Sequence, residues 1–115
     1  MRSTGKGTIV NIGSIAGRWP ISLAGAAYSS AKSGVVALNT VINDEESDNG
    51  IRSTVILPGE CETPIMDLRP QPVSAERRKA MLQPEDVAAA TLLAVTLPHR
   101  ACITELVIKP RMSYI

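Results

Sequence analysis

Apolar and polar residues alternate in blocks along the chain, and each block has the length of one helix or strand. The run GTIVNIGS (Gly7–Ser14) is almost continuously apolar and ends in small residues, which is typical of a strand buried on both faces. A loop rich in glycine and proline, residues 15–26, follows it. Beyond this loop, apolar side chains recur at the spacing of a helix. These positions are Ala27, Ala31, Gly34, Val35, Leu38, Val41 and Ile42.

The remaining blocks continue the alternation of helix and strand. The β-branched residues of 51–59 predict a second strand, and ITELVIKP (103–110) predicts a third. Between them we expect a polar, proline-bearing segment, Glu60–Gln83, that contains a short helix capped by Ser74. A longer helix, 84–97, should begin at a proline, which suits the first turn.

This order of elements predicts an α/β fold. Strands that alternate with helices indicate parallel strands joined by right-handed crossovers. Residues 1–115 are long enough for one domain or for part of one. Three parallel strands are few for a doubly wound sheet, and an apolar strand near residue 1 would have an uncovered edge. We therefore expect the chain to be the carboxyl-terminal part of a larger domain.

Composition removes several classes of function. Twelve Lys and Arg nearly balance eleven Asp and Glu, so no broad positive charge favours nucleic acid or an anionic membrane. The sequence contains no apolar window long enough to span a bilayer, and its amino terminus lacks the apolar core of a signal peptide. Cys61 and Cys102 fit no metal-binding spacing, so we expect no metal site and a reducing, cytoplasmic compartment.

Tyr28 and Lys32 are the first candidates for chemistry. Residues four apart on a helix lie on nearly the same face. An isolated phenol has a pKa near 10 and is a poor base at neutral pH, but a cation held close to its oxygen favours the phenolate. Tyr28 could then give or accept a proton, while the Lys32 ammonium keeps donors for a ribose. Taken alone, such a pair is explained better by packing, because chance pairs at this spacing are common on helices, so context has to decide.

Two further clusters follow predicted strands and supply that context. Ser14 lies at the carboxyl end of the first strand, where open α/β sheets bind ligands. PGECETP (Pro58–Pro64) follows the second strand at the same edge. Small residues there let the backbone approach a ligand, and Thr63 offers a hydroxyl. The sequence therefore favours a binding site at the carboxyl edge of the sheet.

Three motifs together resemble the short-chain dehydrogenase/reductase family, and the resemblance covers nearly the whole chain. In chain order they are TIVNIGSIAG, YSSAK and PGECETP. The resemblance implies a Rossmann-like, doubly wound parallel sheet, represented here by its last three strands and their helices. It also implies an oxidoreductase that moves a hydride between NAD or NADP and a small alcohol or carbonyl substrate. In that scheme Ser14 orients the substrate oxygen, Tyr28 is the general acid/base, and Lys32 binds the nicotinamide ribose.

The same resemblance assigns the segment after the second strand. The nicotinamide end of the cofactor would be held by Pro58, Gly59, Cys61 and Thr63. Cys61 would contribute its backbone groups. Glu60–Gln83 would match the variable loop that covers the substrate. The complete enzyme is expected to form a homo-oligomer.

The amino-terminal, cofactor-binding half of the family pattern is missing from the sequence. No glycine-rich turn for the pyrophosphate and no residue that selects NAD or NADP is present. STGKG (Ser3–Gly7) precedes a strand instead of following one, so it is no substitute. Without those contacts a dinucleotide loses a large share of its binding. The alternative is therefore a truncated, non-catalytic fragment that lacks the pyrophosphate site and persists, if at all, through association with a partner.

Several other charged residues are predicted to be solvated. Glu60 and Glu62 flank the cofactor turn and are expected to be surface groups. Residues 77–79 (RRK) should form an exposed helix face, and His99 should lie in a solvated loop.

Overall fold

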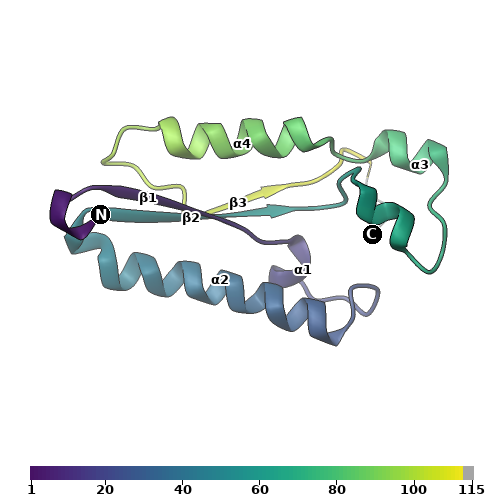
Figure 1. Cartoon of the computed structure of the whole chain (residues 1–115), viewed down its shortest axis with the longest axis horizontal. Coiled ribbons are helices and arrows are strands. Elements are labelled where there is room, and N and C mark those ends of the chain that lie inside the picture. Colours follow the sequence, from purple (N-terminus) through teal and green to yellow (C-terminus); the bar gives the residue numbers. More distant parts are fainter. Residues whose placement is uncertain (113–115) are drawn as a thin grey trace.

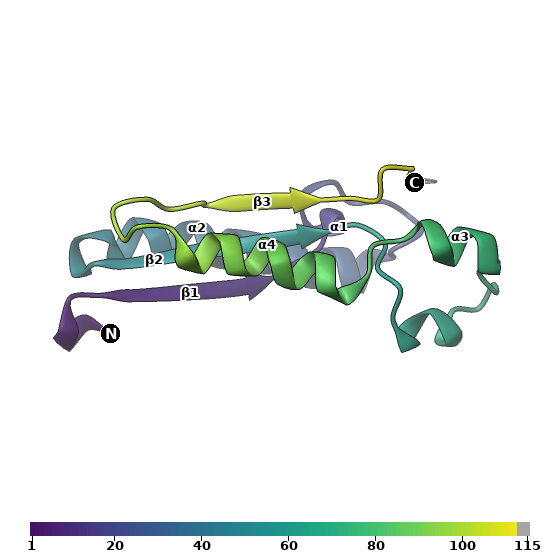
Figure 2. The same cartoon turned by 90° about the horizontal axis from the view of Figure 1, so that it is seen from above.

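Three parallel strands form one sheet with helices on both of its faces (Figure 1). The structure, a computed structural model, describes residues 1–112. The strands β1 (Gly7–Ile12), β2 (Ile51–Pro58) and β3 (Glu105–Ile108) lie side by side in that order (Figure 2). Helix α2 (Ala26–Glu46) covers one face and α4 (Pro84–Thr96) covers the other. The predicted α/β class is confirmed.

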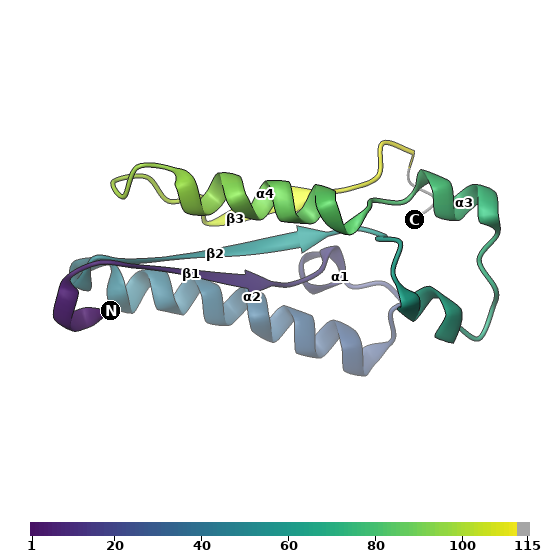
Figure 3. The same cartoon turned by 45° about the horizontal axis from the view of Figure 1, so that its top comes forward.

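The pairing register brings the carboxyl ends of the strands to one edge of the sheet. Both pairings are parallel, so all strands point the same way. The register runs from Gly7 opposite Ile51 to Ile12 opposite Ile56, and from Val55 opposite Glu105 to Pro58 opposite Ile108. Two segments lie beyond this carboxyl edge, α1 (Ile15–Arg18) and residues 60–83, which we call the arm (Figure 3).

The predicted helices are present with small changes in their bounds. Ser74 caps α3 (Ala75–Ala80) by accepting a hydrogen bond from the Arg77 backbone N–H at 3.2 Å, as the sequence predicted. α1 lies in a segment that was predicted to be a loop. Within residues 1–112, no helix has the length and apolar character needed to cross a membrane.

β2 forms the centre of the core. Ile51–Leu57 are all buried, because strands lie on both sides of β2 and helices on both faces. β1 was predicted to be buried on both faces, and this is wrong: it is only half-buried, and Ile12 is 50% exposed. The reason is that β2 is its only strand neighbour within residues 1–112.

Most of the apolar stripe of α2 faces away from the sheet, although Val35 packs against the core. An apolar stripe usually marks the core side of a helix, yet Leu38 and Val41 are 53% and 49% exposed. The buried side instead carries Val36 with two polar residues, Ser29 and Asn39. Polar contacts hold this side to the sheet. The Asn39 Nδ2 donates to Thr104 O at 2.9 Å, and its Oδ1 accepts from the Ser53 hydroxyl at 2.8 Å.

A buried arginine joins β2 to the end of α4. The Arg52 guanidinium donates to the Thr8 hydroxyl from its Nε at 3.0 Å. Its two Nη atoms donate to four backbone carbonyls at 2.6 to 3.2 Å. These carbonyls belong to Val95, Leu97, Pro98 and Ala101. The positive charge therefore lies at the carboxyl end of α4, where the helix dipole favours cations.

We expect Arg52→Met to lower the free energy of unfolding by about 3 kcal/mol, because several buried carbonyls lose their donor at once. Urea denaturation followed by circular dichroism measures this. Arg100→Met is the matched control, since Arg100 is exposed and makes no hydrogen bond within residues 1–112; its effect should stay within about 0.5 kcal/mol. Equal effects of the two substitutions would contradict the role given to Arg52.

Candidate active site

Ser14 follows β1 directly and begins α1. Its backbone is extended, and its Oγ accepts a hydrogen bond from the Ala16 N–H at 3.1 Å. This capping contact fixes the hydroxyl at the carboxyl end of β1. Because Oγ acts as an acceptor there, the hydroxyl proton is left for an acceptor on a ligand.

Tyr28 and Lys32 lie together at the same edge. Tyr28 stands in the first turn of α2 and is 45% exposed. The Lys32 Nζ donates to the carbonyl of Ile12 at 3.1 Å and lies 5.8 Å from the centroid of the Tyr28 ring. The ammonium thus ties the end of β1 to the ring of Tyr28. The structure brings the two side chains together, and their catalytic roles remain a prediction.

A close backbone contact docks α1 onto α2. The Ser33 hydroxyl donates to Gly17 O at 2.9 Å. A Cβ at position 17 would lie only 2.5 Å from Lys32 O, so this approach requires glycine. The contact sets the distance between the helix that Ser14 caps and the helix that carries Tyr28 and Lys32. Sequence reasoning missed Gly17, because one glycine in a predicted loop gives no sign of what it packs against.

The turn after β2 is held from two sides. The Gly59 N–H donates to Ile108 O at 2.8 Å, and a Cβ at Gly59 would lie 3.1 Å from the Pro110 ring. Further along, Cys61 forms a parallel bridge with Leu82. Thr63 then begins the 3-10 helix Pro64–Leu68. The register of β1 and β2, which pairs Ile12 with Ile56, places Pro58 at the strand end beside Ser14. That Pro58, Gly59, Cys61 and Thr63 hold a cofactor stays a prediction.

The Cys61 thiol holds its proton more firmly than an ordinary cysteine, because its pKa is raised. Burial raises its pKa above the ordinary value, and the carboxylates of Asp86 and Glu62 raise it further. The protonated thiol is the unreactive form of cysteine. The described part of the chain also contains no group of three or more His, Cys, Asp or Glu side chains that could hold a metal ion.

The carboxylates beside Cys61 were predicted to be surface groups, and for Glu60 this is wrong. Glu60 is buried and pairs with Arg69 and Arg77. Glu62 pairs with Arg78, so two of the arginines predicted on an exposed helix face are bound within the arm. A sequence with charges of both signs in one segment suits either solvation or pairing, and only the fold distinguishes them.

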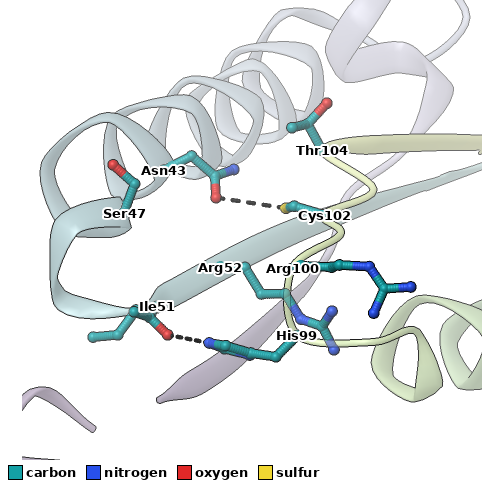
Figure 4. A pocket seen from close by; sticks show the side chains of 9 residues that line it. Asn43, Ser47, Ile51, Arg52, His99, Arg100, Cys102 and Thr104 are labelled. Carbon is teal, nitrogen blue, oxygen red and sulfur yellow. Dashed lines mark hydrogen bonds between the residues drawn. The ribbon is translucent and has the colours of Figure 1, made fainter. Parts of the chain in front are cut away.

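A hollow of about 390 Å³ lies at the opposite, amino end of the strands (Figure 4). Several of its polar groups are used within the chain. The Asn43 side chain both donates to Ser53 O and accepts from Ser53 N–H, at 2.7 and 2.8 Å, and it accepts from the Cys102 thiol at 3.8 Å. His99, predicted to be solvated, donates to Gly50 O at 2.8 Å. We therefore place the candidate site at the carboxyl edge, with Ser14 and Tyr28.

The chain belongs to the short-chain dehydrogenase family, whose model matches residues 1–73. It is 33% identical over 106 residues to an uncharacterized oxidoreductase of Staphylococcus haemolyticus, covering 92% of this chain and 43% of the relative. A closed form of serine dehydrogenase complexed with NADP+ superposes with a TM-score of 0.84 at 30% identity, covering 99% of this chain and 48% of that one. An oxidoreductase of the short-chain dehydrogenase/reductase family from Burkholderia thailandensis superposes with a TM-score of 0.79 at 28% identity. The match covers 96% of this chain and 46% of that one.

These comparisons confirm the predicted family and the Rossmann-like sheet. They also show that the chain spans less than half the length of these relatives.

We expect Gly17→Ala to destabilise the protein by about 1 to 3 kcal/mol, because the added methyl group forces α1 away from Lys32. Gly34→Ala is the matched control. It also lies in a helix, but a Cβ there meets no atom within 4 Å, so this substitution should stabilise by up to about 1 kcal/mol. Urea denaturation of both variants gives the comparison. The same sign for both would contradict the close contact at Gly17.

Proposed function

We propose that this chain is the carboxyl-terminal, catalytic part of an NAD(P)-dependent oxidoreductase that acts on a small alcohol or carbonyl compound. One observation carries the proposal: the Lys32 ammonium is anchored on Ile12 O beside the ring of Tyr28, at the carboxyl edge of a parallel sheet. Open α/β sheets bind ligands at that edge. The family membership and the NADP+ complex of the related serine dehydrogenase support the same chemistry.

The residues present fit the nicotinamide end of such a cofactor. The Lys32 ammonium lies at the end of β1 beside the exposed Tyr28 ring, and the backbone turn at Gly59 follows the neighbouring strand β2. The pyrophosphate end has no counterpart, since the sequence holds no G-x-G-x-x-G turn. When bound, the nicotinamide would supply or accept the hydride.

The roles of the side chains follow from their chemistry. Tyr28 gives a proton to the carbonyl oxygen as that oxygen gains negative charge, and takes one from the alcohol in the reverse direction. The Lys32 ammonium has donors left for the ribose hydroxyls beside its hydrogen bond to Ile12 O. The Ser14 hydroxyl donates to the same substrate oxygen and thereby orients it. Together they stabilise charge that develops during hydride transfer.

The substitution Tyr28→Phe, made in the enzyme of which this chain is proposed to be the carboxyl-terminal part, tests the role of Tyr28. We expect turnover to fall by about 100-fold or more, because the proton donor is lost. The fold should be unaffected, since the Tyr28 hydroxyl makes no hydrogen bond within residues 1–112. Ser30→Ala is the control: it removes another exposed hydroxyl two residues away, one that only donates to Ala26 O within the helix. Wild-type turnover in a folded Tyr28→Phe variant would refute the role of Tyr28.

A second candidate is a non-catalytic chain that works only with a partner polypeptide. The observation that favours it is the exposed apolar surface. The total accessible surface of the chain is 7255 Å², whereas that of a compact monomer of its mass is about 6,000 Å². Its radius of gyration is 15.7 Å, against about 13 Å for a compact domain of this length. Leu38 and Val41 on α2 and Leu92 and Leu93 on α4 contribute to this surface.

Titration of NADPH against the purified 115-residue chain separates the two candidates. If the chain needs a partner, nicotinamide fluorescence will show no saturable binding in the micromolar range, and sedimentation will show self-association or aggregation through the apolar surface. The physical reason is that the pyrophosphate contacts, a large share of dinucleotide affinity, are missing. Saturable micromolar binding by a monomer would contradict the second candidate and favour the first.

A further inference from the structure

Two neighbouring arginines of α3 bind the two glutamates that flank Cys61. The Arg77 Nη2 donates to the Glu60 Oε1 at 2.6 Å. The Arg78 guanidinium donates to both carboxylate oxygens of Glu62, at 2.7 and 2.5 Å. We call Glu60, Glu62, Arg77 and Arg78 the clamp. It joins the helix near the end of the arm to the segment where the arm begins.

Burial and further partners strengthen the clamp. The Glu60 side chain is only 7% exposed and also accepts from the Arg69 Nη1 at 3.1 Å. A buried carboxylate is costly unless cations pair with it, so Glu60 requires these arginines. On the other side, Arg78 also donates to the Asp67 Oδ1 at 2.8 Å. Its guanidinium holds the pKa of Glu62 below the ordinary value, so Glu62 is charged at neutral pH.

The backbone between the two glutamates is fixed in the same place. The Leu82 N–H donates to Glu60 O at 3.0 Å, and Leu82 O accepts from the Glu62 N–H at 2.8 Å. In such a parallel bridge the N–H and C=O of Cys61 point away from Leu82. The clamp and the bridge close the arm at its base and leave the backbone groups of Cys61 directed to the other side.

We propose that Glu60 and Glu62 are positioning residues, which through Arg77 and Arg78 hold the arm against the turn after β2 before any ligand binds. The arm projects beyond the carboxyl edge of the sheet, where α1 also lies (Figure 3). One wall of the substrate site is then preformed by ion pairs instead of being ordered by substrate. The meaning of this wall rests on the proposed function, but the pairing that forms it does not.

Hydrogen–deuterium exchange of the full chain, without cofactor, tests the proposal at the backbone amides of residues 64–80. Glu60→Gln keeps the size of the side chain and removes its charge. Glu60→Asp keeps the charge and shortens the side chain. Glu76→Gln is the matched control, because Glu76 is an exposed arm residue that makes no ion pair within residues 1–112. Glu62→Gln examines the second half of the clamp.

We expect Glu60→Gln and Glu62→Gln each to speed exchange in the arm by about tenfold or more, as the loss of charged hydrogen bonds implies. Amides of β2 should be unchanged, Glu76→Gln should have no effect, and Glu60→Asp should keep most of the protection. Three results would overturn the proposal. The first is unchanged exchange in Glu60→Gln. The second is faster exchange in Glu60→Asp than in Glu60→Gln, which would mean that packing and not charge holds the arm. The third is an equal rise in the exchange rate of the β2 amides, which would mean global unfolding. None of these readings depends on cofactor binding or turnover, so a failed catalytic assignment is distinguishable from a failed clamp.

Discussion

The backbone contact between Gly17 and Lys32 is the constraint on which the candidate site depends. Ser14 belongs to the end of β1, whereas Tyr28 and Lys32 belong to α2, so their relation depends on how α1 packs on α2. A side chain at position 17 would collide with the backbone of Lys32, and only glycine permits the observed approach. The hydrogen bond from Ser33 to Gly17 O and that from Lys32 to Ile12 O secure the same arrangement from both helices.

Polar contacts join the helices to the sheet beside the apolar cluster of Val36, Val55 and Leu57. Asn39 and Asn43 connect α2 with Ser53 on β2, and Arg52 connects β2 with the end of α4. Each of these buried groups is satisfied, which such networks need in order to stabilise a fold. Most of the apolar stripe of α2 takes no part in the core, although Val35 packs against it. The stripe otherwise lies on the surface, together with the edge of β1 that no strand within residues 1–112 covers.

The sequence allowed the order of elements, the parallel sheet and the carboxyl-edge location of Ser14 and Tyr28 to be predicted. These depend on local patterns: apolar runs, capping residues such as Ser74, and helical spacing. Residues that act through tertiary contact were missed. Gly17 looked like any loop glycine, and Glu60 looked solvated because its partner Arg77 lies 17 positions away.

The sequence pattern also failed to predict which side of α2 faces the sheet. Periodicity locates an apolar stripe but does not say what covers it. The stripe with Leu38 is exposed within this chain, while Asn39 is buried because it finds hydrogen-bond partners on the sheet. Buried polar residues with partners contributed by other elements are invisible to a count of apolar positions.

The central claim is that Ser14, Tyr28 and Lys32 face one ligand. A crystal structure of the protein with NADP+ bound measures this most directly. We expect the nicotinamide ribose within hydrogen-bonding distance of Tyr28 and Lys32, with Ser14 facing the reactive ring. A cofactor bound elsewhere, or bound at this edge with the Tyr28 hydroxyl turned away from it, would rule out a shared ligand for these three residues.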